Sequence, residues 1–137
     1  QQERYFRCFR QPYQNEELLR ETNYSEYYGT VEDDQQNKIP CCCARFIQLS
    51  PSFIRKRVGN FFQQGNDKII FFCIFALGTT PQYQGRGYAS SMVEYLMYKA
   101  KKLGATHIGL HSVEKAESMY SRLGFKKIAS QWSYRFS

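Results

Sequence analysis

The sequence predicts an α/β domain, and three observations in its second half support this. The stretch Lys68–Gly78 is apolar almost throughout, as expected for a strand in the centre of a covered sheet. A glycine-rich turn, Gln84–Ala89, follows it. Beyond the turn, apolar residues recur at steps of three and four, which is the period of a helix. A further strand, helix and strand complete the alternating order of an α/β fold.

The first half carries shorter signals and shows no internal repeat. Loose alternation predicts a strand at Tyr5–Phe9, and Asn15 is placed to cap a helix over Asn15–Tyr27. The acidic and amide residues of Glu32–Lys38 indicate a solvated loop. Further strands are expected at Cys41–Leu49 and at Asn60–Gln63.

Glycines mark the ends of the helices in the second half. The first helix has its apolar stripe from Ala89 to Leu103, and Gly104 is expected to end it in a left-handed conformation. Thr106–His111 is predicted to be a strand, and Lys126–Phe136 one or two closing strands. The second helix is expected to be capped by Ser112, ended by Gly124 and buried at Val113, Ala116, Met119 or Tyr120, and Leu123.

Length and composition predict a single domain, residues 1–137, of a cytoplasmic protein. The longest apolar run, Ile69–Leu77, is far shorter than the ~20 residues that span a bilayer, so no membrane partner is expected. The first residues carry no signal segment. Five cysteines form no CxxC pair, and neither histidine stands at metal-ligand spacing from them. A reducing compartment and no metal are therefore expected.

The net charge of +7 is unevenly distributed along the chain. Residues 1–67 hold nine basic and nine acidic side chains, whereas residues 68–137 hold ten basic and three acidic ones. The whole excess lies in the half that contains the glycine turn. A basic surface attracts the phosphates of a nucleotide cofactor and of a nucleic acid alike, so charge alone does not choose between them.

The turn at Gln84–Ala89 has the chemistry of an anion site. Gly85 and Gly87 permit positive φ and close approach of a phosphate, because no Cβ intervenes. The first amides of the following helix point outward, and Arg86 adds a full charge. A Walker loop and a dinucleotide fingerprint are excluded, because the chain lacks Gly-Lys-Ser/Thr and Ser90 stands where a third glycine belongs.

Two stretches of the second half form recognisable motifs. Gln84, Gly87 and Ala89 form Gln-x-x-Gly-x-Ala, and Ala116–Phe125 forms Ala-x-x-Met-Tyr-x-x-x-Gly-Phe. They resemble the acetyl-CoA motif Gln/Arg-x-x-Gly-x-Gly/Ala and the second motif Ala-x-x-Leu-Tyr-x-x-x-Gly-Phe of the GNAT superfamily of N-acetyltransferases, with Met119 at the Leu position. The motifs stand in the family's order with one helix and one strand between them, and the likeness covers about residues 69–128.

The resemblance implies a mixed, mostly antiparallel central sheet with helices on both faces and a splayed pair of parallel strands. It also implies acetyl-CoA as co-substrate, held by the amides of the turn and by the strand edge before it. Tyr120 would act as general acid toward the leaving thiolate, since a phenol has a pKa of ~10. The residues expected to bind the cofactor are Leu77, Gly78, Thr79, Gln84, Gly85, Arg86, Gly87, Tyr88, Ala89 and Ser112.

The sequence departs from the family pattern at two points. Val113 stands where many members carry an Asn, so Ser112 is expected to replace that cofactor contact. The strand Ile69–Leu77 has no acid that could serve as a base for the amine. His111 is the preferred base, because a histidine titrates near neutrality. The alternatives that stay open are a merely structural His111 and a base supplied by Glu114, Glu26 or Glu32.

Several other reactive or charged side chains are expected to be structural. Cys73 is predicted in the core, Cys41–Cys43 in a β segment, and His107 on the surface. The lysines expected on solvated faces, some of which would meet the 3′-phosphate of CoA, are Lys101, Lys102, Lys126 and Lys127.

The leading hypothesis is an N-acetyltransferase that moves an acetyl group from acetyl-CoA directly to a primary amine of a small molecule or a protein. The alternative is a domain of the same fold that binds acyl-CoA as a sensor or scaffold with weak or lost catalysis. A third reading, a basic and aromatic nucleic-acid-binding domain, is disfavoured because no RNA-recognition signature is present. Nucleic acid is therefore not an expected partner, and a homodimer is left open.

Overall fold

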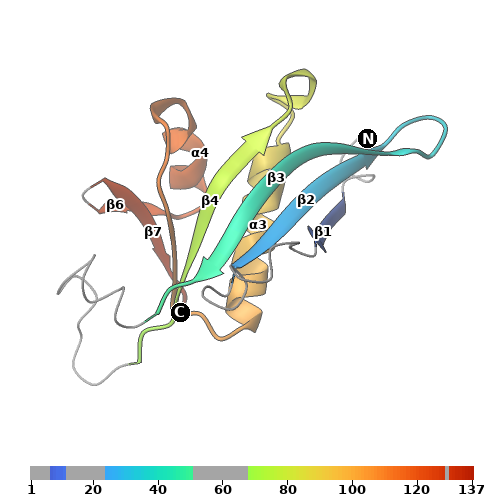
Figure 1. Ribbon diagram of the computed structural model, residues 1–137. Helices are drawn as coiled ribbons and strands as arrows, with labels where there is room; N and C mark the ends of the chain where they lie inside the picture. Colours follow the sequence, from blue (N-terminus) through green and yellow to red (C-terminus); the bar gives the residue numbers. More distant parts are fainter. Residues whose placement is uncertain (1–6, 12–23, 51–67, 129) are drawn as a thin grey trace.

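The computed structural model describes residues 7–11, 24–50, 68–128 and 130–137, which contain one sheet of seven strands (Figure 1). The strands are β1 (Arg7–Gln11), β2 (Tyr24–Glu32), β3 (Lys38–Gln48), β4 (Phe71–Thr79), β5 (His107–Leu110), β6 (Lys126–Ile128) and β7 (Gln131–Arg135). Their order across the sheet is β1-β2-β3-β4-β5-β7-β6. Neighbours are antiparallel except for β4 and β5, which are parallel. The predicted fold class is confirmed.

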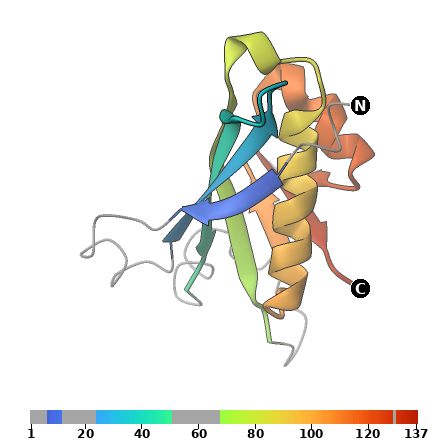
Figure 2. The same ribbon diagram turned by 90° about the vertical axis from the view of Figure 1, so that its right-hand side faces the viewer.

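Two α-helices and two 3-10 turns connect the later strands. They are η3 (Pro81–Tyr83), α3 (Tyr88–Lys102), η4 (Glu114–Ala116) and α4 (Glu117–Arg122). Helix α3 packs across β3 and β4, behind the sheet in Figure 1, and runs along it from the loop that follows β4 (Figure 2). Among the described residues, no helix is long and apolar enough to cross a bilayer.

The predicted stripe of α3 forms the centre of the core. Met92, Val93, Leu96 and Ala100 have no exposed surface and pack with residues of β3, β4 and β5. Leu103, expected to end the stripe, lies at the C-cap and is 61% exposed. The stripe is thus a turn shorter than the sequence suggests.

An irregularity in β4 separates it from β5. Ala76 has a φ of 52°, a left-handed conformation that is rare for a residue with a side chain. The pairing of β4 with β3 shifts there by one residue and continues to Thr79. Pairing with β5 ends at Ile74 and Leu110. The two parallel strands therefore diverge beyond Ile74, as the resemblance implied.

The first half differs from the sequence prediction at one element. The prediction of a helix over Asn15–Tyr27 is wrong at its end, because Tyr24 to Tyr27 belong to β2. There Tyr27 pairs with Ala44 of β3 and buries its side chain, a tertiary contact that overrides helix propensity. The rest of that helix and the strand at Asn60–Gln63 lie outside the described residues, whereas the strand near Tyr5–Phe9 and the loop after Glu32 are confirmed.

The second predicted helix is shorter than expected and lacks its predicted cap. The Ser112 hydroxyl donates to the carbonyl of Val113 at 2.7 Å and makes no capping bond to the helix. Val113 is extended and 63% exposed, so its predicted burial is wrong. Gly124 ends α4 with a φ of 96°, and Gly104 follows α3 with a φ of 84°, as predicted.

His107 is buried, contrary to the prediction of an exposed side chain. It is 9% exposed and stacks on Phe71, its neighbour across β4 and β5, with ring centroids 5.9 Å apart. Its Nδ1 lies 2.8 Å from Oγ1 of Thr106. Burial, and secondarily the charge of Arg135, lower the pKa of His107. The sequence could not reveal this, because Phe71 is remote along the chain.

The described cysteines are free thiols in or beside the sheet. Cys41 and Cys42 are buried in β3, Cys43 is exposed and Cys73 is half-buried in β4. Burial raises the pKa of the Cys73 thiol to about 11, so it stays protonated near neutrality. The structural role predicted for Cys73 fits this placement.

Candidate active site

The loop after β4 is folded back so that α3 begins at the edge of the sheet. The N–H of Thr80 donates to the carbonyl of Cys41 at 2.9 Å, which ties the loop to β3. The side chain of Gln84 donates to the carbonyl of Thr79 at 3.1 Å. Gln84, the first residue of the acetyl-CoA motif, therefore stabilises the loop, because its side chain bonds the turn to the end of β4.

Two glycines shape the amino end of α3. Gly85 and Gly87 have φ of 76° and 86°, and Gly87 is the N-cap. A Cβ at either position would meet no protein atom within 4 Å, so both face open space. The first helical bond runs from Ser91 to Gly87, and the amide of Ala89 precedes it. The positive-φ glycines and the helix start that the sequence suggested are thus present, and anion binding there stays a prediction.

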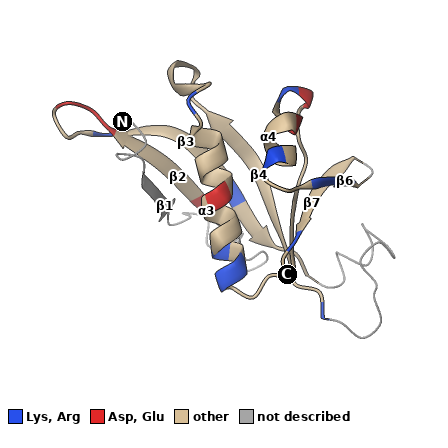
Figure 3. Ribbon diagram, turned by 180° about the vertical axis from the view of Figure 1, so that it is seen from behind, with Lys and Arg blue, Asp and Glu red and all other residues tan. Residues whose placement is uncertain are grey.

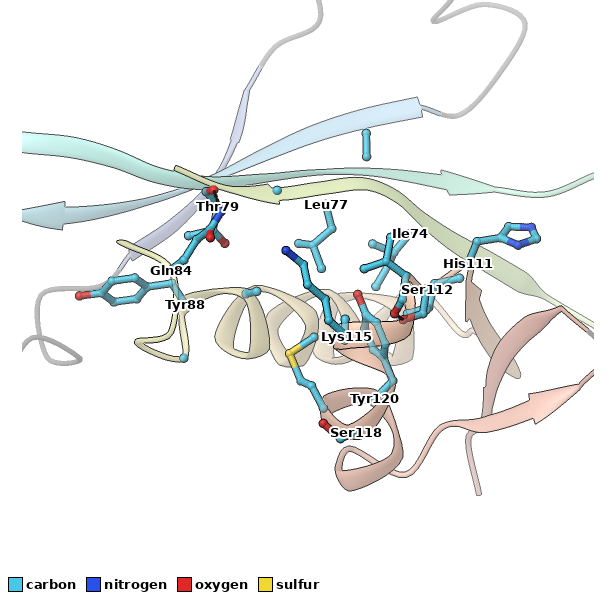
Figure 4. Close-up of a pocket in the computed structure, with 18 of the residues that line it drawn as sticks. Ile74, Leu77, Thr79, Gln84, Tyr88, His111, Ser112, Lys115, Ser118 and Tyr120 are labelled. Carbon is cyan, nitrogen blue, oxygen red and sulfur yellow. Dashed lines mark hydrogen bonds between the residues drawn. The ribbon is translucent and has the colours of Figure 1, made fainter. Parts of the chain in front are cut away.

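A cleft of about 740 Å³ joins this helix end to the gap between β4 and β5 (Figure 4). One wall is the outer half of β4 from Ile74 to Thr79, and the other is the segment after β5, including α4. The cleft meets the two needs of an elongated ligand, an anion site at one end and a strand edge along its length. Its lining includes all the predicted cofactor residues except one: Leu77, Gly78, Thr79, Gln84, Gly85, Gly87, Tyr88, Ala89 and Ser112.

Arg86 is the predicted cofactor residue that does not line the cleft. Its guanidinium lies over the ring of Tyr83, 5.5 Å from the ring centroid. Tyr83 itself lines the cleft and packs edge-on against Tyr88. Arg86 therefore adds a positive charge near the predicted anion site, and its guanidinium packs on Tyr83 in the wall of the cleft.

Tyr120 projects from α4 into the cleft. The residue is 4% exposed and its ring packs against Phe125 at 5.8 Å. Its hydroxyl points toward β4 at the place where β4 and β5 diverge (Figure 4). Burial raises the pKa of Tyr120, so the phenol stays protonated near neutrality.

His111 is the one predicted base candidate that lines the cleft within the described part of the chain. It directly follows β5 and is exposed, on the side of the divergence away from α3's first turn (Figure 4). Glu26 lies on β2 and pairs with Arg45 at 3.3 Å. Neither Glu32 nor Glu114 lines the cleft.

Two cations line the cleft that the sequence analysis did not single out. Lys115 directly precedes the second motif and Arg122 lies within it, and the amine of Lys115 points across the cleft toward β4 (Figure 4). No acidic side chain lines the cleft among the residues described. The four lysines expected near a 3′-phosphate, Lys101, Lys102, Lys126 and Lys127, do not line it. The signal that could have found Lys115 is its place one residue before the motif alanine.

Comparisons with known proteins agree with this architecture. A family model described as an acetyltransferase (GNAT) domain matches residues 27–127. No curated protein matches the sequence. Among solved structures, Arabidopsis thaliana NAA60 in complex with acetyl-CoA superposes with a TM-score of 0.67 at 12% identity, covering 82% of this chain and 76% of that one.

Two further structures cover more of the chain. A mutant AtaT toxin, bound to the C-terminus of the antitoxin AtaR and to acetyl-CoA, gives a TM-score of 0.66 at 10% identity, covering 96% of this chain and 93% of the toxin. An IAA acetyltransferase from Bacillus cereus gives 0.66 at 10% identity, covering 96% and 99%. At such identities the structural likeness shows a common fold.

Proposed function

Because this chain belongs to the GNAT acetyltransferase domain family, we propose that it is an N-acetyltransferase that transfers the acetyl group of acetyl-CoA directly to a primary amine. One observation carries the proposal. The anion site of α3, the diverging edge of β4 and the hydroxyl of Tyr120 open into a single cleft. The acceptor is a small molecule or a protein that presents an amine.

The residues of the cleft fit acetyl-CoA. The amides after Gly87 and the open space above Gly85 suit the diphosphate. Beyond Ile74 the ladder between β4 and β5 ends, so the edge at Leu77–Thr79 can hydrogen-bond the amide-bearing pantetheine arm as an added strand would. Lys115 and Arg122 supply two positive charges for the phosphates from the opposite wall.

Tyr120 is placed to protonate the sulfur that leaves. The amine nitrogen attacks the thioester carbon, the carbon–sulfur bond breaks, and the thiolate takes the phenolic proton. A raised pKa keeps Tyr120 protonated until this step. The fixed packing of its ring on Phe125 holds the hydroxyl in place.

His111 is the proposed acceptor of the amine's proton. It directly follows β5 and lines the cleft, with its ring turned away from Tyr120 in Figure 4. Acid and base would then approach the thioester from two elements, α4 and the end of β5. Its imidazole can act directly or through one water.

The proposal is tested by incubating the protein with acetyl-CoA and a panel of small-molecule and peptide amines. Released thiol and the mass of the acetylated amine are measured together. Equal amounts of both support acetyl transfer to the amine, and no release of thiol when the amine is left out supports direct transfer. Binding of acetyl-CoA without transfer to any amine would instead favour the sensor or scaffold function, for which the absence of an acid in the described cleft is the supporting observation.

A further inference from the structure

Half of the basic residues after position 67 lie far from the cleft. Arg86, Lys115 and Arg122 belong to the cleft or its rim, and Lys126 and Lys127 to β6. The remaining five gather at the opposite end of the sheet, where α3 ends and β4 begins (Figure 3). We call this surface the basic end; it comprises Lys68, Lys99, Lys101, Lys102 and Arg135.

Hydrogen bonds around Thr106 hold the segments of the basic end together. The N–H of Thr106 donates to the carbonyl of Ile70 at 2.8 Å, and the N–H of Ile70 donates to Oγ1 of Thr106 at 2.9 Å. The N–H of Phe136 donates to the carbonyl of Thr106 at 2.9 Å. The segments before β4, before β5 and after β7 therefore meet at one place, close in sequence to Lys68, Lys102 and Arg135.

The basic end also carries exposed apolar side chains. Tyr98 is 55% exposed and Leu103 is 61% exposed. The ammonium of Lys102 lies 5.1 Å from the ring centroid of Tyr98. Tyr98, Lys101 and Lys102 are spaced three and four residues apart and share one face of α3. Glu94, one turn earlier, is the acid that borders this face.

A positive potential at the basic end is visible in a neighbouring group. Arg135 stands opposite His107 in the sheet, and its charge contributes to the lowered pKa of that histidine. Exposed lysines beside an aromatic ring offer two kinds of contact at once. Phosphates bind the ammonium groups, and a flat base stacks on the ring.

We propose that the basic end binds single-stranded nucleic acid, with phosphates on Lys101 and Lys102 and an unpaired base on Tyr98. A single strand is favoured because stacking requires a base outside a duplex. A membrane surface fits less well, because the apolar stripe of α3 is buried against the sheet and, among the described residues of the basic end, only Tyr98 and Leu103 are exposed large apolar side chains. The proposal does not depend on the acetyl transfer proposed for the cleft.

The test is fluorescence anisotropy with a labelled single-stranded RNA and the matching DNA, in the presence of saturating CoA to occupy the cleft. With two phosphate contacts, on Lys101 and Lys102, affinity should fall roughly sevenfold between about 50 and 200 mM salt. Lys102→Glu should weaken binding at least about tenfold and Tyr98→Ala about fivefold or more. Lys126→Glu makes the same charge change on β6 and should have a much smaller effect.

Several results would overturn the proposal. They are no binding at about 50 mM salt, equal losses for Lys102→Glu and Lys126→Glu, displacement of the oligonucleotide by CoA, and binding to anionic vesicles with none to the oligonucleotides. Thermal unfolding and CoA titration of each variant would show that the fold and the cleft are intact.

Discussion

At the scale of single residues, the ring of Tyr120 serves packing and its hydroxyl serves the proposed chemistry. Its ring is held by Phe125, whereas its hydroxyl projects into the cleft. Tyr120→Phe should therefore keep the fold and the affinity for acetyl-CoA but lower kcat roughly 100-fold, the lower range for loss of a general acid. Steady-state kinetics with an amine found in the panel would measure this. Tyr98→Phe, at an exposed tyrosine outside the cleft, is the matched control.

Lys115 lines the cleft in the structure, although the sequence analysis did not single it out. Its amine points into a cleft that contains no acid among the described residues. Lys115→Met should weaken acetyl-CoA roughly tenfold, since a charge-assisted hydrogen bond contributes about 1.5–3 kcal/mol. Calorimetric titration would measure the change. Lys126→Met removes the same charge outside the cleft, and an equal loss there would refute a specific contact.

At the scale of elements, the sequence predicted the local units well and their junctions poorly. The strand, glycine turn and helix around Gln84–Ala89 follow from local periodicity and turn chemistry, and all of them form. The divergence at Ala76 does not follow, because an alanine gives no sign of a left-handed φ imposed by its neighbours. Lys115 has a sequence signal in its place before the motif alanine, but its direction into the cleft depends on the packing of η4, which the sequence does not show.

The two glycines that follow helices α3 and α4 can be compared by what surrounds them. Gly104 and Gly124 both have positive φ. A Cβ on Gly104 would meet open space, but one on Gly124 would lie 2.9 Å from the ring of Tyr134. Gly104→Ala should cost about 1 kcal/mol from backbone strain alone, and Gly124→Ala about 2 kcal/mol or more. Urea unfolding of both variants would check the order, and the reverse order would contradict the packing at Tyr134.

At the scale of the whole molecule, burial of His107 links folding to pH. The pKa of His107 is lowered in the folded state, so the unfolded chain binds the extra proton more readily. Its contribution to stability is complete above the ordinary value of ~6.5, declines below it, and is lost once pH falls through the folded pKa. Unfolding by urea at about pH 7.5 and 5 should show weaker stability in acid.

A variant isolates the contribution of that histidine. His107→Gln removes the titrating ring, so the loss of stability between about pH 7.5 and 5 should be smaller than in the parent. An unchanged loss would assign the acid sensitivity to other groups. The buried ring stack with Phe71 also predicts a lower stability of this variant at neutral pH.

The central claim, that the amino end of α3 holds the phosphates of acetyl-CoA, is tested most directly by two glycines of the same helix. Gly87 and Gly104 have φ of 86° and 84° at its two ends, and neither would place a Cβ within 4 Å of another atom. An aspartate at either position meets similar backbone strain, but only at Gly87 does its charge face the proposed phosphate site. By calorimetric titration, Gly87→Asp should lose measurable acetyl-CoA binding while Gly104→Asp keeps it. Equal binding by both variants, or no binding by the parent protein, would contradict the account.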